Sequence, residues 1–216
     1  MVNYRDKAKR AERVVHEIRT SGGQAIAIRA DLTDAAAVDA MIHQVGDTFG
    51  GLDLLVLNAS GGMERGADPG YALRLNRDAQ VGLVERAAPL LRAGSRVVFV
   101  TSHQAHFHQQ CPVPLAYEPV ARSKRAGEDA LRALAPELAS RGVALVVVSG
   151  DMIEGTITVT LLERAQPGTL ATRLAQVPEI PTIQQFAAEI VDAATAMEPP
   201  RDTVYVGGAD YLSEPR

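Results

Sequence analysis

Short apolar segments alternate with amphipathic segments along most of the chain, and this alternation constrains the fold more than any other feature. Apolar residues recur three and four positions apart in segments 11–18, 38–45 and 183–194, which is the spacing of one buried helix face. Short runs rich in aliphatic and β-branched residues, typical of strands, lie at 25–30, 54–57, 96–100, 143–148 and 203–206. Three of these runs are apolar almost throughout, as expected for strands covered on both faces. The sequence therefore predicts an α/β fold with a doubly wound, mostly parallel sheet. Thr33 is the predicted N-cap of the second helix.

The composition favours a single globular domain. A chain of 216 residues can bury one substantial core, so we expect residues 1–216 to form one domain. With 46% hydrophobic and 22% charged residues, the chain is not of the disordered class. The net charge is −4 and the basic residues form no stripe, which disfavours nucleic acid as a partner.

Two features bear on the cellular compartment. Cys111 is the only cysteine, so an internal disulfide cannot form, and a reducing compartment fits. The longest strongly apolar run, 143–148, is far shorter than the ~20 residues that span a bilayer. The first residues also lack the apolar segment of a signal peptide. We therefore expect a cytoplasmic protein that does not bind a membrane.

Polar residues and glycines mark the points where the predicted strands end. In open α/β sheets, ligands bind beyond the carboxyl ends of the strands. The candidate positions there are Arg5, Asp31, Asn58, Ser102 and Gly150. We expect all five to lie along one edge of the sheet.

Around these positions, six segments resemble, in order, motifs of the short-chain dehydrogenases/reductases. They are Ala30–Asp34 (the acidic stretch that binds adenine), Leu57–Gly61 (the Asn-Asn-Ala-Gly segment), Leu75-Asn76 (the helix asparagine), Val100–Ser102 (the strand with the catalytic serine), Ala121–Ala126 (the Ser-Lys-x-Ala core around the catalytic lysine) and Val148–Gly150 (the Pro-Gly position). The resemblance runs from Val2 to Gly208 and implies a Rossmann-like sheet.

The resemblance implies hydride transfer between a nicotinamide cofactor and a carbonyl or secondary alcohol. Ser102 would hydrogen-bond the substrate oxygen, Asn76 would help to hold a water molecule, and Lys124 would stabilise a tyrosine phenolate. Arg5 could pair with a 2′-phosphate, which favours NADP over NAD, although NAD is possible. The implied cofactor-binding residues are Arg5, Asp31, Asn58, Ala59, Lys124 and Gly150. A homodimer or homotetramer is also implied, formed through the helices that carry Asn76 and Lys124.

The sequence departs from the family pattern at the tyrosine. The family places it four residues before the lysine, where this chain has Val120, and the nearest tyrosine is Tyr117, seven residues before Lys124. On a continuous helix, seven residues span roughly 10 Å and four span about 6 Å. Pro119 suits the first helical position, so Tyr117 is expected just outside the helix, where the loop could fold its phenol back. Our hypothesis is that Tyr117 is a relocated acid/base, which completes the predicted catalytic set of Asn76, Ser102, Tyr117 and Lys124.

A second departure concerns the family's first strand and its Gly-x-x-x-Gly-x-Gly loop, which have no counterpart in the sequence. We expect the given sequence to be truncated at this end, through a misplaced start codon or a truncated gene. Because the family's first strand lies in the middle of the sheet, two strand edges are expected to be unpaired there.

Other interpretations of these residues remain open. Arg5 could be a solvated arginine at a helix start, Asp31 a helix-start carboxylate, and Asn58 a turn-closing residue. The cluster of His103, His106 and His108 suggests a metal-dependent hydrolase, although acidic or thiolate partners are missing nearby, so no metal is predicted. Val120 favours another alternative, a non-catalytic relative that acts by association or regulation.

Overall fold

The computed structural model describes residues 1–64, 66, 68, 70–200 and 203–208. The described residues form strands β1 Val2–Tyr4, β2 Ala27–Arg29, β3 Leu52–Leu57, β4 Leu91–Ser102, β5 Ala144–Gly150 and β6 Val204–Val206. The helices are α1 Ala8–Thr20, α2 Ala35–Phe49, α3 Tyr71–Leu73, α4 Ala79–Ala87, α5 His103–His106, α6 Glu118–Ser140, α7 Ile157–Ala165, α8 Thr169–Leu174 and α9 Ile183–Thr195. A π-helical turn, η1 Arg74–Asp78, joins α3 to α4, and a 3₁₀ turn, η2 Ala88–Leu90, precedes β4. Every predicted helix and strand segment overlaps an observed element of the same type.

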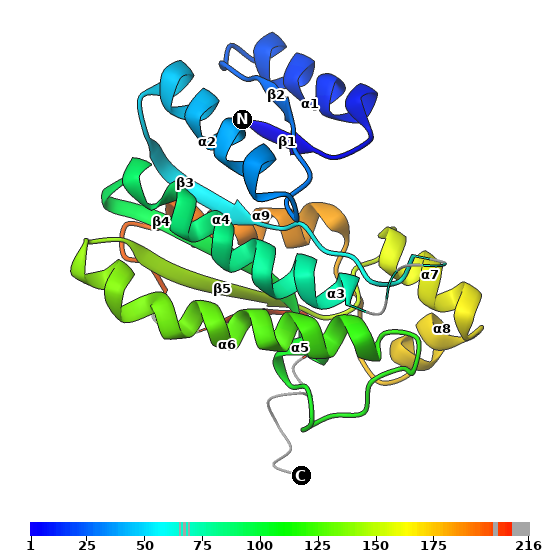
Figure 1. Cartoon of the computed structure of the whole chain (residues 1–216). Coiled ribbons are helices and arrows are strands. Elements are labelled where there is room, and N and C mark those ends of the chain that lie inside the picture. Colours follow the sequence, from blue (N-terminus) through cyan, green and yellow to red (C-terminus); the bar gives the residue numbers. More distant parts are fainter. Residues whose placement is uncertain (65, 67, 69, 201–202, 209–216) are drawn as a thin grey trace.

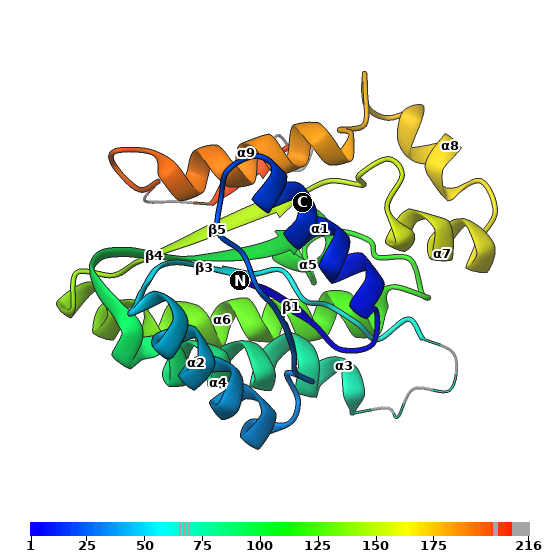
Figure 2. The ribbon, with the colours of Figure 1, turned by 90° about the horizontal axis from the view of Figure 1, so that it is seen from above.

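Parallel pairing joins four strands in the order β3-β4-β5-β6 (Figure 1). Side chains of β4 alternate between the two faces of this sheet, as a period of two requires. Val97 and Phe99 pack in the core beneath α2, α4 and α6, whereas Val98 and Val100 pack on the other face against α9. Figure 2 shows the two helix layers on opposite sides of the strands. The prediction of a mostly parallel α/β sheet is confirmed.

The second helix begins one residue later than predicted. Asp34, and not Thr33, is the N-cap of α2, because its carboxylate accepts hydrogen bonds from the N–H groups of Ala36 and Ala37. The hydroxyl of Thr33 instead donates to Asp31. Aspartate is a better N-cap than threonine, and the Thr33 hydroxyl is already bonded to Asp31, so both effects favour Asp34.

The sheet is divided in two. β1 and β2 pair in parallel as a separate two-stranded sheet, and within the described residues neither of them pairs with β3 (Figure 1). Leu54 and Val56 of β3 remain 39% and 40% exposed, whereas Leu55 and Leu57 on its other face are buried. The expectation that two strand edges would be unpaired in the middle of the sheet is therefore confirmed.

Helix α6 approaches the η1 turn very closely at Gly127. A Cβ atom at this position would lie 2.1 Å from the Asn76 carbonyl oxygen and 3.4 Å from the Arg77 Cα. Both of these atoms belong to the backbone, so they cannot move aside as the end of a flexible side chain could. The absence of a Cβ at Gly127 thus fixes the separation between the helix that carries Lys124 and the turn that carries Asn76.

Candidate active site

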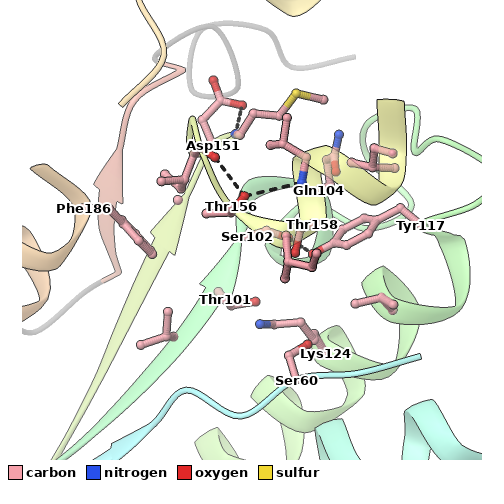
Figure 3. A pocket seen from close by; sticks show the side chains of 18 of the residues that line it. Ser60, Thr101, Ser102, Gln104, Tyr117, Lys124, Asp151, Thr156, Thr158 and Phe186 are labelled. Carbon is pink, nitrogen blue, oxygen red and sulfur yellow. Dashed lines mark hydrogen bonds between the residues drawn. The ribbon is translucent and has the colours of Figure 1, made fainter. Parts of the chain in front are cut away.

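A cavity of about 550 Å³ lies at the carboxyl ends of β3, β4 and β5 (Figure 3). The strands contribute Asn58, Ser102 and Gly150, and α6 contributes Tyr117, at its N-cap, and Lys124. Helices α7 and α9 close the cavity with apolar side chains, among them Leu162 and Phe186. This is the place where an open parallel sheet binds its ligands.

Ser102 and Tyr117 meet inside this cavity. Their hydroxyl oxygens are 3.1 Å apart, within hydrogen-bonding distance, although the residues come from the end of β4 and the start of α6. Ser102 is also the N-cap of α5, where its Oγ accepts the Ala105 N–H at 3.2 Å. That bond fixes the orientation of the serine. Tyr117 lies just outside the first turn of α6, as predicted, and its phenol points to Ser102.

Tyr117 lies in an apolar environment. It packs with Ala105, Val120, Ala121 and Leu162 and is 5% exposed. Burial raises the pKa of its phenol above the ordinary value, and the hydrogen bond from Ser102 opposes this only in part. The phenol is therefore neutral at physiological pH and able to donate its proton. Val120, at the position of the family tyrosine, serves as a packing partner of Tyr117.

Lys124 extends into the same cavity, and its amine points toward Thr101 in Figure 3. Its side chain is buried, and among the described residues its ammonium has neither a hydrogen-bond acceptor nor an ion-pair partner. Burial lowers the pKa of this amine to about 8. Burial raises the pKa of the Tyr117 phenol, and Lys124 is not among the groups that lower it. The stabilisation of a phenolate by Lys124 therefore stays a prediction.

Replacing Lys124 with methionine should stabilise the fold at neutral pH. The pKa of this lysine is about 8 in the folded protein against 10.5 ordinarily, so the unfolded chain binds more protons between these values. The free energy of unfolding therefore rises as pH increases from 8 to 10.5. At about 1.4 kcal/mol per pKa unit, we expect Lys124→Met to gain up to roughly 3 kcal/mol at pH 7 and little at pH 10.5. Urea denaturation at both pH values measures this.

Lys9→Met, on the exposed face of α1, is the matched control and should change stability at neither pH. A loss of stability in Lys124→Met at pH 7 would contradict the prediction, because it would mean that the ammonium has a stabilising partner.

Asn76 lies behind the cavity and is 1% exposed. Its amide nitrogen donates to the Gly61 carbonyl at 2.8 Å and to the Ser123 hydroxyl at 2.9 Å, and its oxygen accepts the Gly61 N–H at 3.2 Å. Its side chain thus connects the loop after β3 to Ser123 of α6, the residue directly before Lys124. Asn76 does not line the cavity, so its observed contacts give it a positioning role; its predicted hold on a water molecule stays a prediction.

The six predicted cofactor-binding residues separate into two groups. Asn58, Lys124 and Gly150 line the cavity, and a Cβ at Gly150 would lie 2.7 Å from the Phe186 ring. Ala59, Arg5 and Asp31 do not line it. Ala59 instead accepts a hydrogen bond from Gln80 through its carbonyl oxygen.

Arg5 and Asp31 follow β1 and β2, so they lie with the separate two-stranded sheet. Arg5 pairs with Asp6 at 2.7 Å and also hydrogen-bonds the Tyr71 hydroxyl. Asp31 accepts hydrogen bonds from the N–H and the hydroxyl of Thr33, which lower its pKa, and the charge of Arg5 lowers it further. All five strand-end residues follow carboxyl ends, but only Asn58, Ser102 and Gly150 share one cavity.

The three histidines contact different partners. His103 lies between the Ser149 hydroxyl and the Gly207 carbonyl, at 2.8 and 2.9 Å. His106 pairs with the fully buried Glu128 at 2.9 Å. His108 pairs with Glu118 at 2.8 Å. Within the described part of the chain, no three metal-binding side chains converge. These rings connect secondary-structure elements to one another.

Sequence reasoning did not identify Thr101, Gln104 and Asp151 as cavity residues. Thr101 Oγ1 is buried without a hydrogen-bond partner among the described residues. Gln104 and Asp151 lie within two residues of the predicted strand-end positions Ser102 and Gly150. A wider window around each strand end would have included all three.

No helix among the described residues has the length and apolar character needed to cross a membrane.

The sequence is similar to those of known reductases. Over 156 residues, 68% of this chain, the sequence is 32% identical to a hydroxynaphthalene reductase of Aspergillus fumigatus. It is 29% identical over 162 residues, 71% of this chain, to 1-cyclohexenylcarbonyl-CoA reductase of Streptomyces collinus. The chain spans about half the length of these relatives, 55% of each.

Solved structures show the same fold over most of the chain. A short-chain dehydrogenase of Burkholderia cenocepacia in complex with NADP aligns with 95% of this chain and 84% of its own, with a TM-score of 0.76 and 26% identity. A short-chain dehydrogenase/reductase mutant of Serratia marcescens aligns with 95% of this chain and 85% of its own, with a TM-score of 0.77 and 27% identity. The family model described as short chain dehydrogenase matches residues 1–166. This chain therefore belongs to the short-chain dehydrogenase/reductase family.

Proposed function

We propose that this chain is an NADP(H)-dependent oxidoreductase that transfers a hydride between the nicotinamide and a carbonyl or secondary alcohol. One observation carries the proposal: the paired hydroxyls of Ser102 and Tyr117 share a cavity with the ammonium of Lys124, which has no partner among the described residues. A proton donor beside a hydroxyl that can bind a substrate oxygen is what carbonyl reduction requires of a protein. The NADP complex of the Burkholderia relative supports NADP as the cofactor; NAD is the second choice.

The cavity fits the nicotinamide riboside part of such a cofactor. Thr101 presents a buried hydroxyl oxygen that lacks a partner among the described residues, and Lys124 extends its amine into the same cavity; buried polar groups are nearly always satisfied in proteins. Ribose hydroxyls would satisfy both, with Asn58 and Gly150 at the neighbouring strand ends. When bound, the cofactor supplies the hydride. Asp31 and Ala59 would face its adenosine part.

We propose that Tyr117 delivers the proton. Its raised pKa keeps the phenol protonated, so it can act as an acid toward a developing alkoxide without first being protonated. Ser102 already accepts the Ala105 N–H, which leaves its own proton for the phenol oxygen or a substrate oxygen. A protonated donor suits reduction of a carbonyl better than oxidation of an alcohol, so we assign reduction as the favoured direction.

Titration of the chain with NADPH and NADH, followed by cofactor fluorescence, tests the cofactor assignment. We expect saturable binding of both and tighter binding of NADPH, because Arg5 can reach the 2′-phosphate. Arg5→Ala should weaken NADPH binding about tenfold or more, the value of one charge-assisted hydrogen bond, and leave NADH unchanged. Arg13→Ala, on the exposed face of α1, is the control and should alter neither. Absence of NADPH binding by the folded wild-type chain would refute the proposal.

A second candidate is a non-catalytic family member that acts by association or regulation. The observation that favours it is the valine at the family's tyrosine position, which is buried in the core and cannot transfer a proton. The two candidates differ in one result: only the enzyme shows carbonyl-dependent oxidation of NADPH, and it loses this turnover when the Tyr117 hydroxyl is removed.

We also propose that residues 1–216 form a single domain and that this domain assembles as a homodimer or homotetramer in the cytoplasm. The helices α4 and α6 would form the contact, as the family resemblance implies. Light scattering of the purified chain would contradict the assembly if it reported the mass of one chain.

A further inference from the structure

A second cavity, of about 620 Å³, adjoins the first one. Gln104 and Met152 line both cavities. Each of these residues follows, by two positions, a member of the register pair Ser102 and Gly150 on the neighbouring strands β4 and β5. The two cavities therefore meet directly beyond the serine. We call them the near cavity, which contains Ser102 and Tyr117, and the far cavity.

The near cavity has large apolar surfaces from the β5–α7 region and α9, beside the polar side chains of Asp151, Thr156 and Thr158. Ile153, Val159 and Leu162 line it from the β5–α7 region, and Phe186 and Ile190 line it from α9. A substrate carbonyl beside Ser102 would thus carry an apolar group. The exposed Ile157, which also lines the near cavity, extends this apolar surface toward solvent.

The far cavity has a mixed lining, in which Pro112, Val113, Pro114 and Leu115 supply apolar surface beside polar side chains. Its polar side chains are neutral amides and hydroxyls: Gln104, Gln110, Gln166, Gln176, Thr169 and Thr172. Side chains of Gln104, Gln110 and Gln166 make no hydrogen bond with other described residues, so their donors and acceptors are available to a ligand. Carbonyl and N–H groups on the same side chain can pair with hydroxyl, ether or amide groups of either polarity.

Charge in the far cavity is already balanced. Arg173 is its only charged lining residue among those described. It donates to both carboxylate oxygens of Asp151 at 2.8 to 3.0 Å, and the two residues are 6% and 7% exposed. Breaking such a buried pair is costly, so Arg173 is held by Asp151. A carboxylate or phosphate on the ligand would find no uncommitted cation there.

We infer that the substrate is an extended, uncharged molecule, in which an apolar segment bears the carbonyl and a neutral hydroxylated, ether or amide-bearing segment occupies the far cavity. This inference rests on the proposed function for the position of the carbonyl, and on the far cavity for the chemistry of the distal segment. Gln104 and Met152 lie at the junction of the two segments.

The test compares three ketones in ligand-observed NMR titrations, each with and without NADPH. The first is acetophenone, the second carries a tri(ethylene glycol) methyl ether chain at the para position, and the third carries a chain of similar length that ends in a carboxylate. We expect the neutral chain to lower Kd about fivefold or more relative to acetophenone, and the carboxylate chain to lower it less than twofold. One net hydrogen bond corresponds to about two- to twelvefold.

The variant Gln110→Leu/Gln166→Leu should remove this advantage while the Kd of acetophenone stays within twofold. Both side chains are exposed, so the fold should tolerate their loss. Gln44→Leu, on an exposed position of α2, is the control and should preserve the advantage. Equal Kd values for all three ketones, tighter binding of the carboxylate, or no detectable binding of any ketone would each overturn the inference. These results are independent of NADPH binding and turnover, which test the proposed function.

Discussion

Tyr117→Phe is expected to lower kcat for carbonyl reduction by about 100- to 10,000-fold, the range that one positioned general acid contributes. The ring still fills the same apolar environment, so the packing with Val120 and Leu162 is retained. Only the hydroxyl that lies 3.1 Å from Ser102 is lost. The measurement is NADPH oxidation with an aryl ketone under saturating conditions. NADPH affinity and thermal stability should stay near wild type.

Tyr4→Phe on β1 is the control and should retain full turnover, because Tyr4 does not line the cavity. The pH profile provides a second readout. Because the pKa of Tyr117 is raised above 10, the donor stays protonated and kcat for reduction should not fall through loss of its proton below that pH. Wild-type turnover in Tyr117→Phe would show that another group, or none, supplies the proton.

Gly127→Ala is expected to destabilise the chain by about 3 kcal/mol, at the upper end of the usual cost of overpacking. The added methyl carbon would lie 2.1 Å from the Asn76 carbonyl oxygen, so α6 and η1 must separate. For a domain of this size, a loss of 3 kcal/mol lowers Tm by roughly 6–12 °C. Calorimetry measures the shift. Separation of the two elements should also reduce turnover, because Asn76 holds Ser123 beside Lys124.

Gly82→Ala in α4 is the matched control. Its Cβ would meet only the end of the flexible Arg86 side chain, at 2.9 Å, and alanine has the higher helix propensity. Tm should therefore stay constant or rise. If Gly127→Ala and Gly82→Ala behaved alike, the close approach of α6 to η1 would not limit stability.

Helices and strands were predictable from the sequence because their signals are local. The apolar spacing in 38–45 gave α2, and the apolar run at 143–148 gave most of β5. Pro119 indicated the start of α6 to within one residue, since the helix begins at Glu118, and correctly indicated that Tyr117 precedes its first turn. The cap of α2 was assigned one residue too early, because the prediction did not weigh the stronger capping preference of Asp34 and could not show that Thr33 bonds Asp31.

The site was only partly predictable, because its chemistry depends on burial and on contacts between distant segments. Residue types and spacing identified Ser102 and Lys124, but they could not show that Lys124 leaves the pKa of Tyr117 high. Nor could they show that the side-chain amide of Asn76 donates hydrogen bonds to Gly61 and Ser123. The far cavity had no sequence signal, since its glutamines come from separate loops and helices.

The division of the sheet has a consequence for cooperativity. Among the described residues no strand pairing connects β1 and β2 to the other four strands. Ile28 and Ala30 pack with α2, and Arg5 reaches Tyr71, so side chains alone couple this unit to the larger sheet. The unit formed by β1 and β2 can therefore unfold locally at a lower free-energy cost than unfolding of the whole domain. Arg5 and Asp31 belong to it, whereas Ser102 and Lys124 do not. A dinucleotide that contacts both parts would bind only while the two parts are held together. Its apparent affinity for the chain would therefore be lower than its contacts alone would give, by the free energy needed to hold the parts together.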